Sequence, residues 1–437
     1  MNLKNFKDKV FKIARKKGFE AQIEFHEIKE FSVRFSNGEL DQYTDAGKFY
    51  LSIKVLKEGK IGSSYTETIE TPEKYVEEAI SNWEIIDSKD ENFFHDGTGK
   101  YIKMETYNGE FEKLPVKEKL GFVKTIYESA KSDPKIVMVP LALYEDFVQS
   151  VQISNTLGLE VEMKSDGARV FSMAITADKS KHSGIWGTVA KKVSELNPEK
   201  IGKKARDEAL AMLGAKSVKS GKYRAIIRHT ALQDILSLLN SMVSAENIQK
   251  NMSPLKEKIG KQIASTCVNI LDMPFHPLSI QNKPFDSEGV PTIEKAVIEQ
   301  GILKTYLYNL KTAKKDNTKS TGNAHNGAIS FINMTLVPGN KSFEELIDEL
   351  DNGLIIIGVD GIHSGANPIS GNFSLGARGY EVKNGKLSGA VEQITISANF
   401  LTLLNNIETV GNDVHAAPFR AVICPSVLVN EIDVAGE

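Results

Sequence analysis

The sequence predicts an α+β protein of two domains, an N-terminal domain of helices and antiparallel sheet followed by a β-rich C-terminal domain. Its 437 residues exceed what one ordinary hydrophobic core organises. Before residue 214, helical and strand periodicities alternate, whereas Gly, Asn, Ser and β-branched residues dominate beyond residue 223. The stretch 214–222, rich in Lys and Gly, separates these compositions. We therefore expect domains over 1–214 and 223–437.

The N-terminal domain begins with a helix and two hairpins. Apolar residues recur at helical spacing over 3–14, and residues 21–35 alternate as strands do. Asn37-Gly38 is typical of a type I′ hairpin turn. A second hairpin is expected over 50–61, and a helix that has Pro at its first position follows over 72–86.

The same order of elements then recurs. A polar, irregular linker is expected within 87–113. A helix, a strand and a hairpin follow within 116–176, in the order already present over 3–56, which favours an internal duplication. A third helix begins at Asn197-Pro198 and ends near Leu213.

Composition excludes several classes of function. The net charge of −3 gives no long-range attraction for phosphate backbones, so direct nucleic-acid binding is not expected. No window approaches the roughly 18 consecutive apolar residues of a membrane-spanning helix, and the N-terminus is not a secretory signal. Cys267 and Cys424 are the only cysteines, and both are expected to be small buried hydrophobes. We expect a cytoplasmic protein.

Standard catalytic motifs are incomplete. Residues 379–386 lack the spacing of a P-loop, and residues 383–386 are better explained as a hairpin turn. Ser374 is a poor nucleophile elbow, because the position two residues earlier is Asn where the strained turn needs Gly. Asp286 and Glu288, and likewise Asp413, are candidate acid/base carboxylates, for which a turn with solvated or backbone-bonded carboxylates is the favoured alternative.

Two segments of the C-terminal domain bear on function. Residues 230–244 have apolar positions at helical spacing and predict one amphipathic helix. Residues 358–376 combine glycines with short hydrogen-bonding side chains. This composition suits a set of glycine-rich hairpin turns, or an extended edge that binds the main chain of a peptide.

Several short segments, taken together in their order along the chain, are specific enough to indicate a protein family, although each alone is a weak signal. They are Gly59–Tyr65, Pro284–Thr292, Ser320–Ala324, Asn333–Thr335, Asn367–Gly376, Val410–Asp413 and Val434–Gly436. With these segments the chain resembles, over essentially its whole length, the TldD/PmbA family, once called modulators of DNA gyrase.

The resemblance implies a two-domain α+β protein of a cytoplasmic proteolytic complex that digests unfolded or extended peptides. Two subunit types are known in the family. The TldD type carries a His-Glu-x-x-x-His helix, and a cysteine near the C-terminus completes its zinc site. The PmbA type, also called TldE, lacks these ligands and pairs with TldD.

This chain departs from the TldD pattern at the zinc ligands. The motif falls on Leu236–Ser241, which offers no zinc ligand, and the C-terminal Cys-Gly-Lys element is missing. The chain therefore resembles the PmbA type, and we expect it to have no catalytic residues and no metal, with zinc only in a TldD-type partner. In this interpretation a groove for peptide main chain is lined by Asn367, Ser370, Gly371, Asn372 and Ser374.

The expected partners are a TldD-like catalytic subunit and an extended peptide, in a homo- or heterodimer. Two alternatives stay open. One is a self-sufficient metallopeptidase, in which a homodimer uses the scattered ligands His229, His325, His363 and His415. The other is a non-proteolytic regulator of DNA gyrase, which only the older family name suggests.

Overall fold

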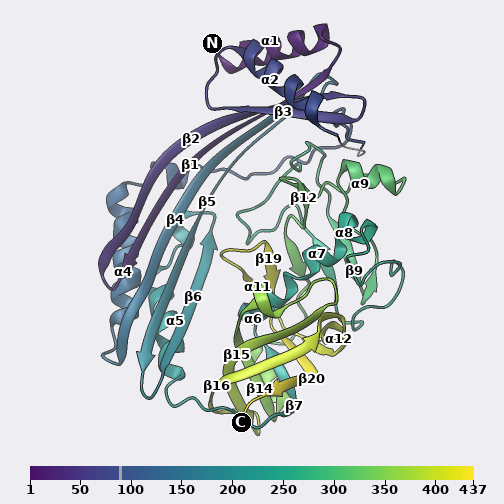
Figure 1. The fold of residues 1–437 in the computed structure, drawn as a ribbon. Helices are drawn as coiled ribbons and strands as arrows, with labels where there is room; N and C mark the ends of the chain where they lie inside the picture. The colour runs from purple at the N-terminus through teal and green to yellow at the C-terminus, as the bar shows by residue number, and fades with distance from the viewer. Residues whose placement is uncertain (88–90) are drawn as a thin grey trace.

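The computed structural model describes residues 1–87 and 91–437, which form the predicted α+β architecture (Figure 1). The N-terminal part is built on one antiparallel sheet in the order β3-β2-β1-β4-β5-β6. Its strands are β1 (Glu20–Ser36), β2 (Glu39–Lys57), β3 (Lys60–Thr66), β4 (Ile136–Asn155), β5 (Glu160–Ala177) and β6 (Lys181–Ala190). The turn between β1 and β2 has positive φ at Asn37 and Gly38, as a type I′ turn requires.

The predicted repeat of elements is present, and each unit is longer than expected. A helix, three strands and a helix occur twice, once from α1 (Leu3–Lys16) to α2 (Pro72–Ile85) and once from α4 (Val116–Lys131) to α5 (Pro198–Ala211). The outermost strand of each unit carries a glycine where its second helix packs. A Cβ on Gly62 would lie 2.1 Å from the carbonyl oxygen of Ala79, and one on Gly184 would lie 2.1 Å from that of Ala205. Only glycine allows this close approach of helix to strand.

The segment between the two units is docked on the sheet. Of the predicted linker 87–113, residues 88–90 lie outside the described residues, and α3 (Glu110–Lys113) forms its end. The side chain of Asn155 donates to the carbonyl oxygen of His95, and the Tyr101 hydroxyl donates to that of Gly289 in the C-terminal domain. A short 3-10 helix, η1 (Val193–Glu195), precedes α5.

The two faces of the N-terminal sheet differ in chemistry. On one face the helices bury an apolar layer that includes Phe6, Val10, Val123 and Ile126. On the opposite face β1 presents the alternate side chains Gln22, Glu24, His26, Ile28, Glu30 and Ser32, which are polar except for Ile28. Figure 1 shows the sheet curving around the C-terminal domain, so this polar face is concave and faces that domain.

The C-terminal domain contains two six-stranded sheets. The first has the order β16-β15-β14-β7-β20-β17, and an additional pairing of β16 with β20 closes it into a barrel-like sheet. Its strands are β7 (Gly221–Ile227), β14 (Gly353–Asp360), β15 (Asn372–Lys383), β16 (Lys386–Asn399), β17 (Ile407–Val410) and β20 (Val427–Ala435). The predicted turn over 383–386 joins β15 to β16, with positive φ at Asn384 and Gly385.

The second sheet has the order β10-β9-β8-β13-β19-β18 and packs with short helices around one large core. Its strands are β8 (Ile270–Asp272), β9 (Lys295–Glu299), β10 (Ile302–Leu303), β13 (Met334–Leu336), β18 (His415–Ala416) and β19 (Val422–Cys424), beside the hairpin of β11 (Ala324–His325) and β12 (Ala328–Ile329). The helices of the domain are α6 (His229–Leu236), α7 (Leu239–Val243), α8 (Ala245–Gln249), α9 (Leu310–Lys315), α10 (Phe343–Leu350), α11 (Ile362–Gly365) and α12 (Phe400–Asn405).

A histidine bridges the two domains at the end of the sheet. Nδ1 of His182 lies 2.6 Å from a carboxylate oxygen of Glu392 on β16, and its Nε2 lies 3.0 Å from Asp178. Burial opposes the charged imidazolium, but these two carboxylates outweigh burial and raise the pKa of His182. This contact therefore strengthens as the pH falls through the raised pKa and is lost as the pH rises above it.

The described ranges contain no helix long and apolar enough to cross a membrane.

Candidate functional site

The segment that carries zinc ligands in TldD-type proteins forms an interrupted helix in this chain. The prediction of one continuous helix over 230–244 is wrong, because α6 ends at Leu236 and α7 begins at Leu239. Between them the N–H of Leu238 donates to the carbonyl of Ile235, three residues back, so the chain tightens to a 3-10 turn. The Ser237 hydroxyl donates to a carbonyl three residues back at 2.6 Å and competes with regular helix bonds.

His229 and His415 lie together beside this helix. Their rings are stacked at 4.6 Å with only 19° between their planes, and Trp186 packs edge-on against His229. Imidazole lone pairs lie in the plane of the ring, so two stacked rings cannot direct nitrogens at one metal ion. Cys424 is buried, and its thiol donates to the carbonyl oxygen of His229.

These residues do not fit a zinc site. Within residues 1–87 and 91–437, no group of three or more His, Cys, Asp or Glu is arranged to hold a metal ion. His325 on β11 and His363 on α11 are exposed and belong to other elements. The four histidines considered for a scattered site therefore contribute one stacked pair and two separate surface residues.

The stacked pair is neutral at physiological pH. Burial lowers the pKa of His229 to about 2 and that of His415 to about 4. Nε2 of His415 donates to the carbonyl of Gly187, and the side-chain amide of Gln233 donates to the carbonyl of His415. Nδ1 of His229 is buried, and within residues 1–87 and 91–437 it has no hydrogen-bond partner.

Replacing His229 with phenylalanine is expected to reduce the loss of unfolding free energy that occurs as the pH falls below 7. The folded chain keeps His229 neutral, whereas the unfolded chain takes up a proton below pH 6.5, so stability falls as the pH decreases. This residue accounts for a loss of about 2 kcal/mol by pH 5. Urea unfolding at pH 7 and pH 5 measures it, and an equal pH dependence in the wild type and the variant would contradict the assignment. His363→Phe, at an exposed position, is the control.

A cavity of about 300 Å³ adjoins α6 between the two domains. We call it the α6 cavity; Trp186, Arg228, Gln233, His415, Phe419 and Arg420 are among the residues that line it. Each of its arginines is paired with a carboxylate, in the pairs Arg228–Glu208, Arg420–Asp234 and Arg378–Asp360. The cavity therefore presents neutralised charges and hydrogen-bonding groups, which suit binding, and no nucleophile paired with a base.

The five residues predicted to contact peptide form a locally bonded turn at the start of β15. Oδ1 of Asn367 accepts from the N–H groups of Ile369 and Ser370, and Gly371 donates to the carbonyl of Asn367. The side chains of Asn367, Ser370, Asn372 and Ser374 are exposed, while Gly371 is buried.

This turn is not a free strand edge. β15 pairs with β16 along its length and with β14 from Gly376 onward, and Ala366 forms a bridge with Phe373. The hydroxyls of Ser374 and Ser397 hydrogen-bond to one another across the hairpin. The alternative of glycine-rich turns thus describes the backbone, and peptide binding by the exposed side chains remains a proposal.

The candidate acid/base carboxylates are engaged with the backbone. Asp286 accepts from the N–H groups of Glu288, Val290 and Ala324, and burial raises its pKa to about 6. Burial and the neighbouring charge of Asp286 raise the pKa of Glu288 to about 7, and Glu288 accepts from the N–H of Leu310. Asp413 accepts from the N–H and hydroxyl of Ser426.

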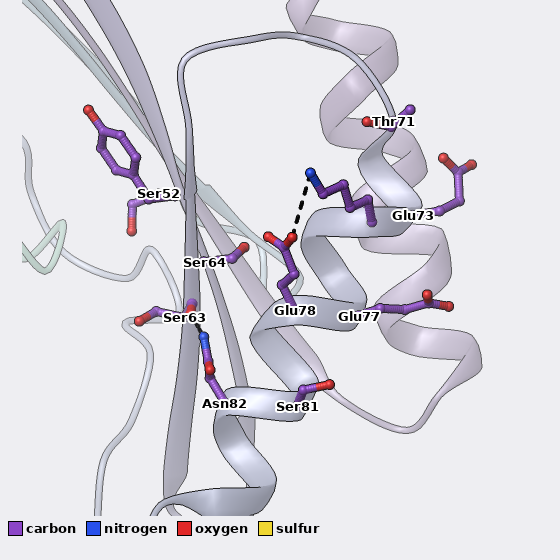
Figure 2. Close-up of a pocket in the computed structure, with 11 residues that line it drawn as sticks. Ser52, Ser63, Ser64, Thr71, Glu73, Glu77, Glu78, Ser81 and Asn82 are labelled. Carbon is purple, nitrogen blue, oxygen red and sulfur yellow. Dashed lines mark hydrogen bonds and ion pairs between the residues drawn. The ribbon is translucent and has the colours of Figure 1, made fainter.

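Another surface hollow lies between α2 and the strands β2 and β3. Figure 2 shows serine and glutamate side chains around it, with Lys74 paired to Glu78 and the amide of Asn82 donating to the carbonyl of Ser63. Its glutamates are exposed to solvent. Within the described residues, its lining contains no buried side-chain nitrogen or oxygen that lacks a hydrogen-bond partner. This hollow therefore has no feature that selects a ligand.

With this geometry known, comparison with other proteins identifies the family. Models of the PmbA/TldA metallopeptidase match domain 1 over residues 21–82, the central domain over 109–213 and the C-terminal domain over 220–436. The chain belongs to the PmbA/TldD family. The matches leave 83–108 uncovered, which overlaps the predicted linker.

Curated relatives and solved structures agree with this assignment. The chain is 30% identical over 311 residues to the metalloprotease PmbA homolog of Buchnera aphidicola subsp. Acyrthosiphon pisum, covering 70% of this chain and 67% of the relative. A putative modulator of a DNA gyrase from Thermotoga maritima is 51% identical, covers 99% of this chain and 100% of its own, and superposes with a TM-score of 0.96. TldE from Thermococcus kodakarensis, 22% identical over 99% of this chain and 100% of its own, shares the fold with a TM-score of 0.92. The chain is thus a PmbA-like member of a metalloprotease-related family.

Sequence reasoning missed most of the residues around α6. Trp186, Arg228, Gln233 and Arg420 carry no local motif, and they meet only when β6, α6 and the loop before β19 come together. One signal was available, because Trp186 is one of only two tryptophans in the chain.

Proposed function

We propose that this chain is a non-catalytic, peptide-binding subunit of a cytoplasmic metallopeptidase complex, whose zinc and catalytic residues belong to a TldD-like partner carrying His-Glu-x-x-x-His. The observation that carries the proposal is the chemistry of Leu236–Ser241, which provides leucine, serine and asparagine where the partner type has ligands. Membership of the PmbA/TldD family and the similarity to PmbA-type relatives, over 70% of this chain for the Buchnera aphidicola homolog, support it.

The α6 cavity and the turn over 367–374 are the parts of this chain that would hold peptide in such a complex. The turn presents neutral hydrogen-bonding groups, and the arginines of the cavity are paired with carboxylates, so both suit main-chain amides without reading their sequence closely. Water would be activated only on the partner, because His229 and His415 present stacked faces and Cys424 is a buried thiol.

Co-expression with a TldD-like protein tests the proposal. We expect the two chains to co-purify and to hydrolyse an unfolded peptide in a chelator-sensitive way, while the isolated chain binds no stoichiometric zinc and cleaves nothing. Chelator-sensitive cleavage by the isolated chain, with one zinc per molecule, would instead establish the self-sufficient homodimeric peptidase. Capture of DNA gyrase by the isolated chain without any proteolytic complex would favour the regulator.

A further inference from the structure

A second interdomain cavity lies on the concave face of the N-terminal sheet. It encloses about 620 Å³, a typical size for a ligand pocket, and β1, β2, β4 and β5 form its floor. Residues 280–283 of the C-terminal domain line it from the other side. We call it the sheet cavity; its lining includes Thr44, Phe147, Gln149, Ile280, Lys283 and Phe419. Phe419 also lines the α6 cavity, so the two cavities adjoin along β5.

Lys283 lines the sheet cavity and carries a positively charged side chain. Its Nζ lies 3.5 Å from Nδ1 of His325, and in the described part of the chain no carboxylate oxygen lies within the 4.0 Å of an ion pair. Asp286, the carboxylate whose charge acts on Lys283, already accepts three backbone N–H groups. Burial lowers the pKa of Lys283, as it does for an ammonium group that lacks a counter-ion.

The backbone holds Lys283 firmly in this position. Its N–H donates to the carbonyl of Pro274, and its own carbonyl accepts from the hydroxyl of Thr292. The preceding Asn282 is buried, and its side-chain oxygen accepts from the N–H of His276 and from the amide of Asn333. These bonds fix the point from which the Lys283 side chain extends, so a ligand would have to order only that side chain.

The acidic residues on the opposite wall do not neutralise Lys283. Glu145 is paired with Arg169 and accepts from the hydroxyl of Ser32. Asp146 is paired with Lys119 beneath α4. Glu30 also lines the cavity, but within the described residues its carboxylate forms no ion pair with Lys283. The rest of the lining is neutral and partly aromatic, which suits the apolar and amide groups of a peptide.

We propose that the sheet cavity binds a carboxylate group of a peptide through Nζ of Lys283, with the neighbouring residues of that peptide lying along β5. The carboxylate belongs either to the C-terminus of the peptide or to an acidic side chain. This inference rests on the proposed function in one respect, the identification of a peptide as the ligand. It adds a charge preference that main-chain binding by the α6 cavity does not have.

Peptide binding to the purified full chain tests the inference by fluorescence anisotropy. Three labelled peptides share one unfolded sequence: one ends in a free carboxylate, one in an amide, and one in an amide with a single internal glutamate. We expect the amide without glutamate to bind about 10- to 100-fold more weakly than at least one of the others, the range expected for a hydrogen bond between charged groups. The peptide that binds tightly identifies the source of the carboxylate.

Substitutions assign the preference to Lys283. Lys283→Met is expected to abolish it, Lys283→Arg to retain most of it, and Lys386→Met, at an exposed position on the β15–β16 turn, to leave it unchanged. A thermal unfolding temperature for Lys283→Met at or above that of the wild type establishes that the variant folds. Equal binding of all three peptides to the wild type, or an undiminished preference in Lys283→Met, would overturn the inference.

Hydrolysis by the complex with a TldD-like partner separates this inference from the proposed function. If the rate of partner-dependent hydrolysis is the same with and without the peptide carboxylate, and the same in Lys283→Met, the carboxylate site is rejected and the proposed function is retained. Failure to form any active complex, together with carboxylate-dependent binding by the isolated chain, retains the site and rejects the proposed function.

Discussion

Replacing Asp272 with alanine is expected to lower the free energy of unfolding of the C-terminal domain by about 3–5 kcal/mol. Asp272 is fully buried on β8 and satisfies four donors at once. One oxygen accepts from Nζ of Lys295 and the side-chain amide of Asn323, both at 2.7 Å. The other accepts from the N–H groups of Ile332 and Asn333. Alanine would leave the ammonium of Lys295 buried without a counter-charge.

Urea unfolding followed by circular dichroism measures this loss. Asp360→Ala is the matched control, because it also breaks a carboxylate–cation pair, with Arg378, but at a carboxylate that is 76% exposed. Exposed pairs contribute about 0–1 kcal/mol, so the control should unfold close to the wild type. If Asp272→Ala lost no more stability than Asp360→Ala, this network would not hold the loops of the domain together.

Replacing Gly184 with valine is expected to destabilise the N-terminal domain by about 3 kcal/mol or more. A Cβ at this position of β6 would lie 2.1 Å from the carbonyl oxygen of Ala205 and 2.2 Å from the backbone nitrogen of Ala209. Both are backbone atoms of α5, which cannot move aside as a flexible side chain does. The helix must separate from the strand and expose the small buried residues beneath it.

Gly47→Val in the same sheet is the control for Gly184→Val. A Cβ at Gly47 meets only the flexible side chain of Lys29, at an ordinary contact distance of 3.7 Å, so valine should be tolerated there. Thermal unfolding of the two variants compares them directly. Similar unfolding temperatures for both would show that α5 does not depend on its contact with β6. Gly62→Val should repeat the effect at α2, because the two glycines occupy equivalent places in the repeat.

Local chemistry in the sequence was sufficient for several elements. Asn37-Gly38 and Asn384-Gly385 take the positive φ that two-residue hairpin turns demand, so both turns were predictable from two residues each. Asn197 accepts from the N–H of Lys200 at the start of α5, with Pro198 at the first helical position. These devices act within a few residues and depend little on the rest of the chain.

Other elements were predicted only in part, because their partners are distant in the chain. β1 extends without interruption from Glu20 to Ser36, although the sequence alternation is weak between residues 26 and 30. The reason is that β1 is hydrogen-bonded on both sides, to β2 and to β4. Side chains on one face of β1 line the sheet cavity. The helix expected over 230–244 breaks at Ser237, because the hydroxyl of Ser237 donates to a backbone carbonyl. The apolar pattern that predicted the helix does not take this hydrogen bond into account.

The candidate site shows the same division. The absence of zinc-ligand chemistry from Leu236–Ser241 follows from residue types alone, because no fold turns leucine, serine and asparagine into that set of donors. The sequence by itself also determined the family, the antiparallel hairpins and the α+β class. Only the tertiary structure stacked His229 on His415, paired three arginines around α6 and placed Lys283 at the sheet cavity, where the described residues give it no acidic partner. These contacts join residues separated by long stretches of chain, and their pairing and desolvation depend on how the curved sheet closes over the C-terminal domain.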